Sequence, residues 1–280
     1  MKKKRTIRYR RYVHSKWTKT RALLNDAAVK GYVPATKPLT AASLREMLPL
    51  HRMVYVKPNI GAFGNGVIRV EWRPYTEKPY QYQSGLTLHR FDSMEELSRS
   101  LLAHTAAKRP YLIQQGIHLL TYRKHRFDIR VMVQKTESGS WQTTGIIGRV
   151  ADPRKVVTNV HNGGTLKPVE TLMAHYLSGS KLKQFIQELR TLGVGAGRAL
   201  EKQFRGMKEI GVDVAVDENC RPWILEVNTA PDPYIFRKLK DKSVFRRVYR
   251  LWQLHKPPVK LKPLSARHGL GRVLSPKRRA

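Results

Sequence analysis

The sequence predicts a mixed fold in which β-hairpins are combined with amphipathic helices. Residues 211–231 and residues 53–72 each contain two short apolar strands joined by a turn or loop, and residues 180–204 carry apolar side chains at helical spacing. The chain has 280 residues, of which 41% are hydrophobic, so it is long enough to bury a sizeable core in one large or two small domains. No internal repeat is apparent.

The predicted hairpin at residues 211–231 carries oxygen-bearing side chains inside its apolar strands. If the strands pair across the turn at 217–219, Asp213 faces Glu226, and Asn228 lies on the same face two residues on. Two carboxylates and an amide oxygen form an all-oxygen site of the kind that Mg2+ prefers, especially when phosphate oxygens complete its octahedron. The alternative interpretation is a solvated hairpin with polar residues on its wet face.

A second stretch suited to phosphate follows the strand at residues 53–58. This strand ends in Lys57, and the loop after it places Gly61, Gly64 and Gly66 within six positions. Such glycines allow backbone N–H groups to approach phosphates. The loop is not a Walker A motif, because the lysine precedes the glycines and a strand follows. A glycine-rich hairpin with a surface lysine remains an alternative.

Further polar residues lie in the middle of the chain. Residues 127–133 alternate, so that Asp128 and Arg130 share one face, where they could also simply pair with each other. Residues 141–150 are the predicted hairpin partner and end near Arg149, and a polar, glycine-ended loop with Asn159 follows at 158–164. Residues 111–117 form another apolar strand, and residues 234–254 are expected to form one helix with a packed face.

The formal charge of +34 is concentrated at the two ends. Residues 1–30 contain 11 Lys or Arg and one acid, and residues 237–280 contain 15 and one, so these segments carry +10 and +14. Basic ends attract phosphate backbones, anionic membranes or acidic polymers, although a solubilising coat is an equal alternative.

Composition excludes several classes of protein. A single cysteine, Cys220, excludes an internal disulfide and a cysteine-based zinc site. The N-terminus lacks the apolar run of a secretory signal, and no stretch of about 20 apolar residues could cross a membrane. We therefore expect no transmembrane segment and a cytoplasmic location.

Three sequence patterns resemble a known superfamily. The pattern D-x12-E-x-N-T-x-P, starting at Asp213, is similar to the metal-binding hairpin of the ATP-grasp ligases, although Asp232 stands where glycine commonly follows. The stretches KPNIGAFGNGVIRV from Lys57 and SKWTKTRALL from Ser15 resemble the YheC/YheD-like endospore coat-associated family. The resemblance covers roughly residues 16–240. It implies an α+β ATP-grasp fold in which two lobes with antiparallel sheets hold ATP between them.

The resemblance also implies a domain layout. A basic N-terminal arm at 1–15 would precede an ATP-grasp domain at 16–240, and a basic helix and tail would occupy 241–280. Within the domain, the nucleotide-binding lobe would span about 50–115 and the metal and catalytic lobe about 116–240. Lys16 or Lys19 could reach toward phosphate, although a solvated helix face is the simpler interpretation of both.

The roles of the site residues follow from the same resemblance. Mg2+ (or Mn2+ in its place) would be held by Asp213, Glu226 and Asn228. The phosphates of ATP would contact Lys57, Gly61, Gly64 and Gly66, the adenine would be read by backbone groups of Gln115, Gly116 and Ile117, and Asp128 would contact the ribose or a neighbouring base. Arg130, Arg149 and Asn159 would clamp the substrate carboxylate and the γ-phosphate.

Three classes of function stay open. The first is an ATP- and Mg2+-dependent carboxylate–amine (or carboxylate–thiol) ligase that acts through an acyl phosphate and is associated with the spore coat. Its unknown carboxylate and nucleophile could belong to an anionic or polymeric substrate such as an acidic peptide. The second is a catalytically degenerate ATP-binding or structural protein that contacts spore-coat proteins. The third is a basic protein whose charged arms bind nucleic acid.

Overall fold

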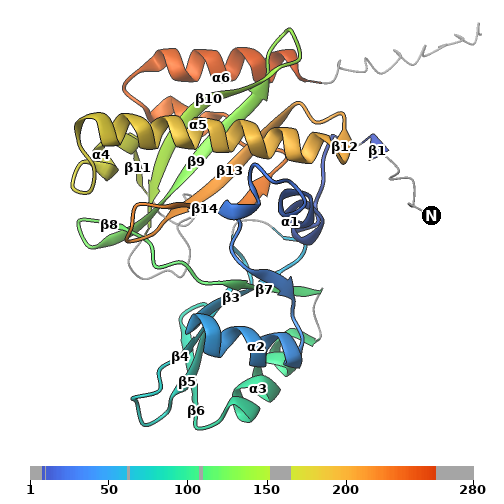
Figure 1. The fold of residues 1–280 in the computed structure, drawn as a ribbon, viewed down its shortest axis with the longest axis vertical. Helices are drawn as coiled ribbons and strands as arrows, with labels where there is room; N and C mark the ends of the chain where they lie inside the picture. Colours follow the sequence, from blue (N-terminus) through green and yellow to red (C-terminus); the bar gives the residue numbers. More distant parts are fainter. Residues whose placement is uncertain (1–7, 10, 62–63, 107–109, 152–164, 257–280) are drawn as a thin grey trace, which may run out of the picture.

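The computed structural model describes residues 8–9, 11–61, 64–106, 110–151 and 165–256. These residues form two lobes, each built on an antiparallel sheet, with helix α1 (Lys16–Leu24) at their junction (Figure 1). The expected α+β class with two sheet-containing lobes is confirmed. No helix in the described residues is long and apolar enough to cross a membrane.

The smaller lobe is a six-stranded sheet covered by two helices. Its strand order is β2-β7-β3-β4-β5-β6, and every neighbouring pair is antiparallel. Its elements are β2 (Thr36–Pro38), α2 (Ala41–His51), β3 (Met53–Pro58), β4 (Ile68–Trp72), β5 (Tyr80–Ser84), β6 (Thr87–Phe91), α3 (Met94–Ala106) and β7 (Tyr111–Gln115). The sheet thus begins at Thr36, before the expected start of this lobe near residue 50, and the exact domain bounds stay a prediction.

The larger lobe is a sheet packed between helices on its two faces. The strand order is β11-β10-β9-β13-β14, with β8 paired to β9. Its elements are β8 (Thr121–Tyr122), β9 (His125–Lys135), β10 (Trp141–Val150), β11 (Thr165–Lys167), α4 (Val169–Met173), α5 (Gly179–Glu201), β13 (Glu209–Val216), β14 (Pro222–Asn228), η3 (Tyr234–Lys238) and α6 (Lys242–Leu254). The short strands β1 (Arg8–Tyr9) and β12 (Phe204–Arg205) pair in parallel, and η1 (Lys30–Tyr32) follows α1.

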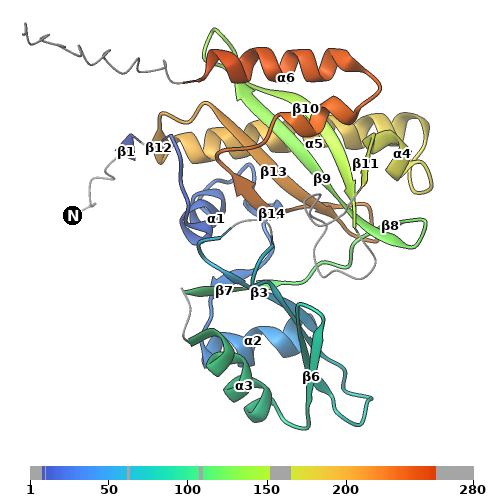
Figure 2. The same cartoon turned by 180° about the vertical axis from the view of Figure 1, so that it is seen from behind.

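Successive side chains of β9 point to opposite faces of the larger sheet, which explains why both faces are covered. Val131 and Val133 belong to the core that includes α5, whereas Met132 points to the other face and packs with Phe236 and Val248. Because successive side chains of a strand point to opposite faces, an uninterrupted apolar strand must be buried on both sides. The sheet therefore forms a central layer, with α5 in front of it in Figure 1 and behind it in Figure 2.

One expected element differs from the structure. The segment expected to form a single helix over residues 234–254 is divided into η3 and α6. The cause is Asp241, whose side chain accepts a hydrogen bond from the Ser243 N–H and so caps the start of a new helix. The division turns η3 toward the sheet, where Phe236 becomes fully buried.

Glycines in α5 allow the helix to approach the sheet closely. A Cβ atom at Gly197 would lie 2.8 Å from Cδ2 of the Trp141 ring, and one at Gly193 would lie 2.8 Å from Cγ2 of Val133. Contacts this short require the neighbouring groups to move. These glycines therefore allow α5 to pack closely against the sheet.

We predict that Gly197→Val destabilises the protein by about 2–3 kcal/mol, because the added methyl groups meet an aromatic ring that is fixed in the core. Thermal unfolding monitored by circular dichroism should show a midpoint lowered by several degrees. Gly31→Val is the matched control, since a Cβ atom there meets nothing within 4 Å. Equal midpoints for the two variants would contradict the packing argument.

Candidate active site

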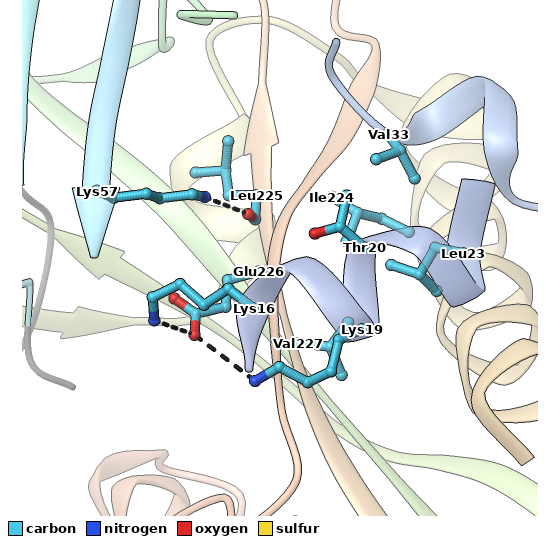
Figure 3. Close-up of a pocket in the computed structure, with 10 residues that line it drawn as sticks. All are labelled: Lys16, Lys19, Thr20, Leu23, Val33, Lys57, Ile224, Leu225, Glu226 and Val227. Atoms are coloured by element: carbon cyan, nitrogen blue, oxygen red, sulfur yellow. Dashed lines mark hydrogen bonds and ion pairs between the residues drawn. The ribbon is translucent and has the colours of Figure 1, made fainter. Parts of the chain in front are cut away.

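A small pocket lies at the junction of the two lobes. Its walls come from α1, the end of β3 and strand β14, and Val33 completes it (Figure 3). The lining residues are Lys16, Lys19, Thr20, Leu23, Val33, Lys57, Ile224, Leu225, Glu226 and Val227. Three lysines thus surround one carboxylate, which gives the pocket an excess of positive charge.

Lys57 lies near the end of strand β3, and its side chain enters the pocket from there. Its ammonium group donates to Oε1 of Gln114 at 2.7 Å and to the carbonyl of Leu225 at 3.0 Å, so it links the two lobes. Burial lowers the pKa of Lys57 from 10.5 to about 8, although the Glu226 carboxylate opposes this shift. A buried ammonium with neutral partners is well suited to an anion, because an incoming phosphate would supply the missing charge.

Lys16 and Lys19 enter the same pocket from α1. Lys16 Nζ lies 2.5 Å from Oε1 of Glu226 and donates to the carbonyl of Gly61 at 3.1 Å, and Lys19 Nζ lies 3.8 Å from the same Glu226 oxygen. Both lysines are less than a tenth exposed. Burial lowers the pKa of Lys19 to about 8, again against the effect of Glu226. The simpler interpretation of a solvated helix face is therefore wrong for both.

The position of α1 is set by contacts with the glycine loop. The Ser15 hydroxyl accepts from the Thr18 N–H as the helix N-cap, and it donates to Oδ1 of Asn59 at 3.0 Å. The Asn59 side chain also accepts from the Trp17 N–H at 2.9 Å. The first turn of α1 is thereby fixed against the loop that follows β3, which brings Lys16 and Lys57 into one pocket.

A second cluster of charges lies across β9, β10 and β13. Arg149 binds Asp128 with two parallel hydrogen bonds of 2.7 Å, and Arg130 Nε donates to Oδ1 of Asp213 at 2.5 Å. Arg149 also lies 3.2 Å from Oδ2 of Asp213. Asp128 and Arg130 share a face of β9, as expected. Because β9 lies between β10 and β13, Asp128 pairs with Arg149 of β10 and Arg130 pairs with Asp213 of β13.

The pKa of Asp213 depends on the charged side chains around it. Burial by itself would raise the pKa of Asp213, but the guanidinium groups of Arg130 and Arg149 outweigh that effect and lower its pKa to about 2. The carboxylate is thus charged at any physiological pH. A solvated hairpin is excluded at this position, because the side chain is only 15% exposed.

The hairpin of β13 and β14 has the expected register. Asp213 lies opposite Glu226, and Gly211 lies opposite Asn228. The Asn228 amide nitrogen is 3.4 Å from Oδ2 of Asp213, so these two side chains meet. In the described residues no three carboxylate, imidazole or thiol groups converge on one point. A metal ion here would therefore also need the amide oxygen of Asn228 and oxygen atoms from a ligand such as phosphate.

The donor set still fits Mg2+ in its chemistry, since it offers two carboxylates and an amide oxygen on paired strands. Each carboxylate is held by protein cations, Asp213 by Arg130 and Glu226 by Lys16. A cation entering the site would have to share these oxygens or displace the side chains that hold them. The roles predicted for the three ligands stay predictions.

The remaining site predictions concern the glycine loop and the segment between the lobes. Gly64 and Gly66 have φ values of 73° and 75°, which glycine adopts without strain. In the segment expected to read adenine, the N–H of Gln115 donates to the Ala35 carbonyl and that of Gly116 to the Met53 carbonyl. Adenine recognition there would rest on the other backbone groups, including those of Ile117, which is 7% exposed. Asn159 lies outside the described residues.

Sequence reasoning gave too little weight to two lysines and overlooked Gln114. Lys16 and Lys19 are three residues apart directly after a serine N-cap, which places them on one helix face, but the pattern does not say what covers that face. Gln114 orients Lys57 and donates to the Thr36 hydroxyl at 3.0 Å. A glutamine inside the apolar strand at 111–117 was the available signal.

Two lobes with antiparallel sheets and a pocket between them fit an ATP-grasp protein, a class whose fold implies ATP binding, and the family comparison shows that class. The profile of the family described as "YheC/D like ATP-grasp" matches residues 6–254. The chain belongs to the YheC/D-like ATP-grasp family.

Two curated relatives come from Bacillus subtilis (strain 168), and both are endospore coat-associated proteins. YheD is 26% identical over 227 residues, which cover 79% of this chain and 49% of the relative. YheC is 21% identical over 221 residues, which cover 77% of this chain and 59% of the relative. The chain thus spans about half to three fifths of the length of these relatives.

A solved structure supports the fold. The ATP-grasp ligase PsnB, complexed with minimal precursor, matches with a TM-score of 0.50 and 14% identity, over 86% of this chain and 60% of that chain. At this identity the likeness shows the fold alone, which is the type found in ATP-grasp ligases.

We predict that ATP binding at about pH 8.5 takes up protons, because phosphate oxygens favour the charged form of Lys57, whose pKa in the free protein is about 8. Affinity should fall as pH rises above about 8, since the free protein then has to gain a proton on binding. Calorimetry in two buffers of different protonation enthalpy measures the uptake.

Two variants test whether Lys57 contributes to this uptake. Lys57→Arg should reduce it, because arginine stays charged throughout this pH range. Lys37→Arg is the control, since Lys37 is an exposed residue paired with Glu46 outside the pocket. An uptake that is the same in Lys57→Arg and in the unaltered protein would contradict the prediction.

Proposed function

We propose that the chain is an ATP- and Mg2+-dependent ligase that joins a carboxylate to an amine through an acyl phosphate. The observation that carries the proposal is the convergence of Lys16, Lys19 and Lys57 with a predicted metal ligand, Glu226, in one pocket between the lobes. A polyphosphate would neutralise the excess charge of this pocket. The family and the ligase-type fold support the same proposal.

The reaction that fits these residues has two steps. In the first, a carboxylate oxygen of the substrate bonds to the γ-phosphorus of ATP as the bond to the β–γ bridging oxygen breaks, which gives an acyl phosphate and ADP. In the second, an amine attacks the acyl carbon, phosphate leaves, and the amine loses a proton. A loose phosphoryl transition state requires positive charge and positioning more than covalent catalysis.

The chain's own residues supply that charge from two directions. Lys57 and the two lysines of α1 lie on the phosphate side, and Arg130 and Arg149 lie across β9 and β10 beside Asp213. Their planar guanidinium groups are suited to a carboxylate or a transferred phosphoryl group. Asp128 keeps Arg149 in place through two hydrogen bonds, so its role in this scheme is to orient a cation.

Mg2+ would be held by Asp213, Glu226 and Asn228, and when bound it supplies charge that neutralises the phosphates. The amine could be replaced by a thiol, and the acceptor could be an acidic peptide. A spore-coat association would follow from the two relatives. An ATP-binding protein without turnover is the alternative that those relatives favour, because both are named for their place in the coat.

We predict that the protein binds ATP in the micromolar range only with Mg2+, and that Glu226→Ala abolishes this Mg2+-dependent binding. Calorimetry with and without Mg2+ measures this. Glu218→Ala is the matched control, because Glu218 is an exposed carboxylate in the turn of the same hairpin. No binding in the unaltered protein would end the ligase proposal, and binding without ADP release on any carboxylate–amine pair would favour the alternative.

We also predict that Lys16→Met weakens ATP binding about tenfold or more while it strengthens metal binding in the absence of nucleotide. Lys16 is the nearest cation to Glu226, so its removal leaves that carboxylate with only the more distant Lys19 as a counter-ion. Paramagnetic resonance of added Mn2+ reports the metal directly. Lys30→Met, an exposed position just after α1, should change neither quantity. Metal binding that is equally weak in Lys16→Met would contradict this role.

A further inference from the structure

The outer surface of the larger lobe carries a group of aromatic rings in mutual contact. We call it the aromatic cluster, and its members are Tyr234, Phe245, Tyr249 and Trp252. Ring centroids lie between 5.4 and 6.3 Å apart. None of these rings is fully buried, and Tyr234 is 43% exposed. Four adjoining rings at a surface are more than a single scattered aromatic residue, which would need no explanation.

The position of the rings follows from the geometry of α6. Phe245, Tyr249 and Trp252 are four and three residues apart and therefore form one stripe of the helix, while Val248 and Leu251 face the sheet and are buried. The stripe thus borders the packed face of the helix: Phe245 also packs against the core under α6, and all three rings stay partly exposed. Tyr234 of η3 meets it from the side. In Figures 1 and 2, α6 lies at the end of the molecule opposite the smaller lobe, away from the pocket between the lobes.

Cations border the aromatic cluster. Arg237 lies 5.9 Å from the centroid of Phe245, and Lys256 Nζ lies 3.9 Å from that of Trp252. Helical spacing puts Lys242, Arg246 and Arg250 on the stripe beside the rings, and α6 contains no acidic residue. The 24 residues that follow, 257–280, contain seven Lys or Arg and no acid. The charge around the rings is therefore mainly positive, and the acids near them are Glu137, which pairs with Arg250, Asp241 at the N-cap of α6, and Asp232, which accepts from the Tyr234 N–H.

We propose that the aromatic cluster and the cations beside it form a binding surface for single-stranded nucleic acid. Unpaired bases stack on aromatic rings regardless of sequence, while a row of cations follows the phosphate backbone. An acidic peptide would use the cations but has no planar groups for four rings. A duplex would use the same cations, but its bases are already stacked on one another. The combination on α6 and η3 therefore fits an unpaired strand best.

The test measures the affinity of the full chain for a fluorescently labelled oligothymidylate of about 20 nucleotides by anisotropy, over a series of salt concentrations. Trp252→Leu, which keeps apolar bulk, and Tyr234→Ala, at the most exposed ring, should each weaken binding about fivefold or more, with an unchanged salt slope. Tyr75→Leu is the control for the aromatic variants, because Tyr75 is 97% exposed on the smaller lobe. Circular dichroism confirms that each variant is folded.

The contribution of charge is tested separately. Arg246→Gln should reduce the slope of log affinity against log salt by about 0.7, the value for one phosphate contact on a single strand. Arg99→Gln, an exposed arginine on α3, should leave the slope unchanged. Glu226→Ala should bind the oligonucleotide normally, which separates this surface from the ATP site.

Three results would overturn the proposal. The first is normal binding by both aromatic variants, which would leave the charge of the chain as the only cause of oligonucleotide binding. The second is equal affinity for a duplex of the same length. The third is equally strong competition by a polyglutamate peptide of matched net charge, which would assign the surface to acidic peptides.

Discussion

The structure depends on one electrostatic constraint, which is that charges buried between the lobes must be balanced by neighbours. Five cations lie in or beside the pocket, and three carboxylates, Asp128, Asp213 and Glu226, face them. Since an unpaired buried charge is costly, this excess of cations favours the loss of a lysine proton or the entry of an anion. Burial lowers the pKa values of Lys19 and Lys57 to about 8, which makes the first outcome easier at alkaline pH, and a bound polyphosphate would give the second.

Much of this arrangement could be predicted from the sequence where local patterns determine structure. The alternating valines of β13 determine which face Asp213 occupies, and the turn at Asp217 returns β14 beside β13, whereas the pairing of Asp213 with Glu226 also requires the register shift between Asp213 and Val214. The partner of Asp128 could not be predicted in this way. It depends on the register of β9 with β10, which shifts between Thr143 and Gly145 and so aligns Arg149 with Asp128. Register shifts of this kind leave no clear mark in the sequence.

The burial of α1 could not be predicted from local sequence patterns either. Its sequence contains lysines at positions that a solvated helix would also carry, and its apolar character is weak. The helix is placed by Asn59, which lies 44 residues from Ser15 in the chain and accepts from its hydroxyl. A contact over this distance depends on the tertiary fold, so no helical pattern could reveal that Lys16 would reach Glu226. Resemblance of the SKWTKTRALL stretch to a family indicated a phosphate role, but the physical pattern alone did not.

The charge of the whole chain requires an explanation beyond the nucleotide pocket. Of the formal +34, residues 1–30 and 237–280 carry +24, whereas the site places its five cations against three carboxylates and so contributes little net charge. Self-repulsion of this size opposes a compact state, so a surface that gathers more cations than acids is costly unless a polyanion covers it. On α6 the cations border rings that are left partly exposed, although apolar rings would otherwise be buried. Charge alone would suit any polyanion, but exposed rings among the cations restrict the choice to a polyanion that also presents planar groups.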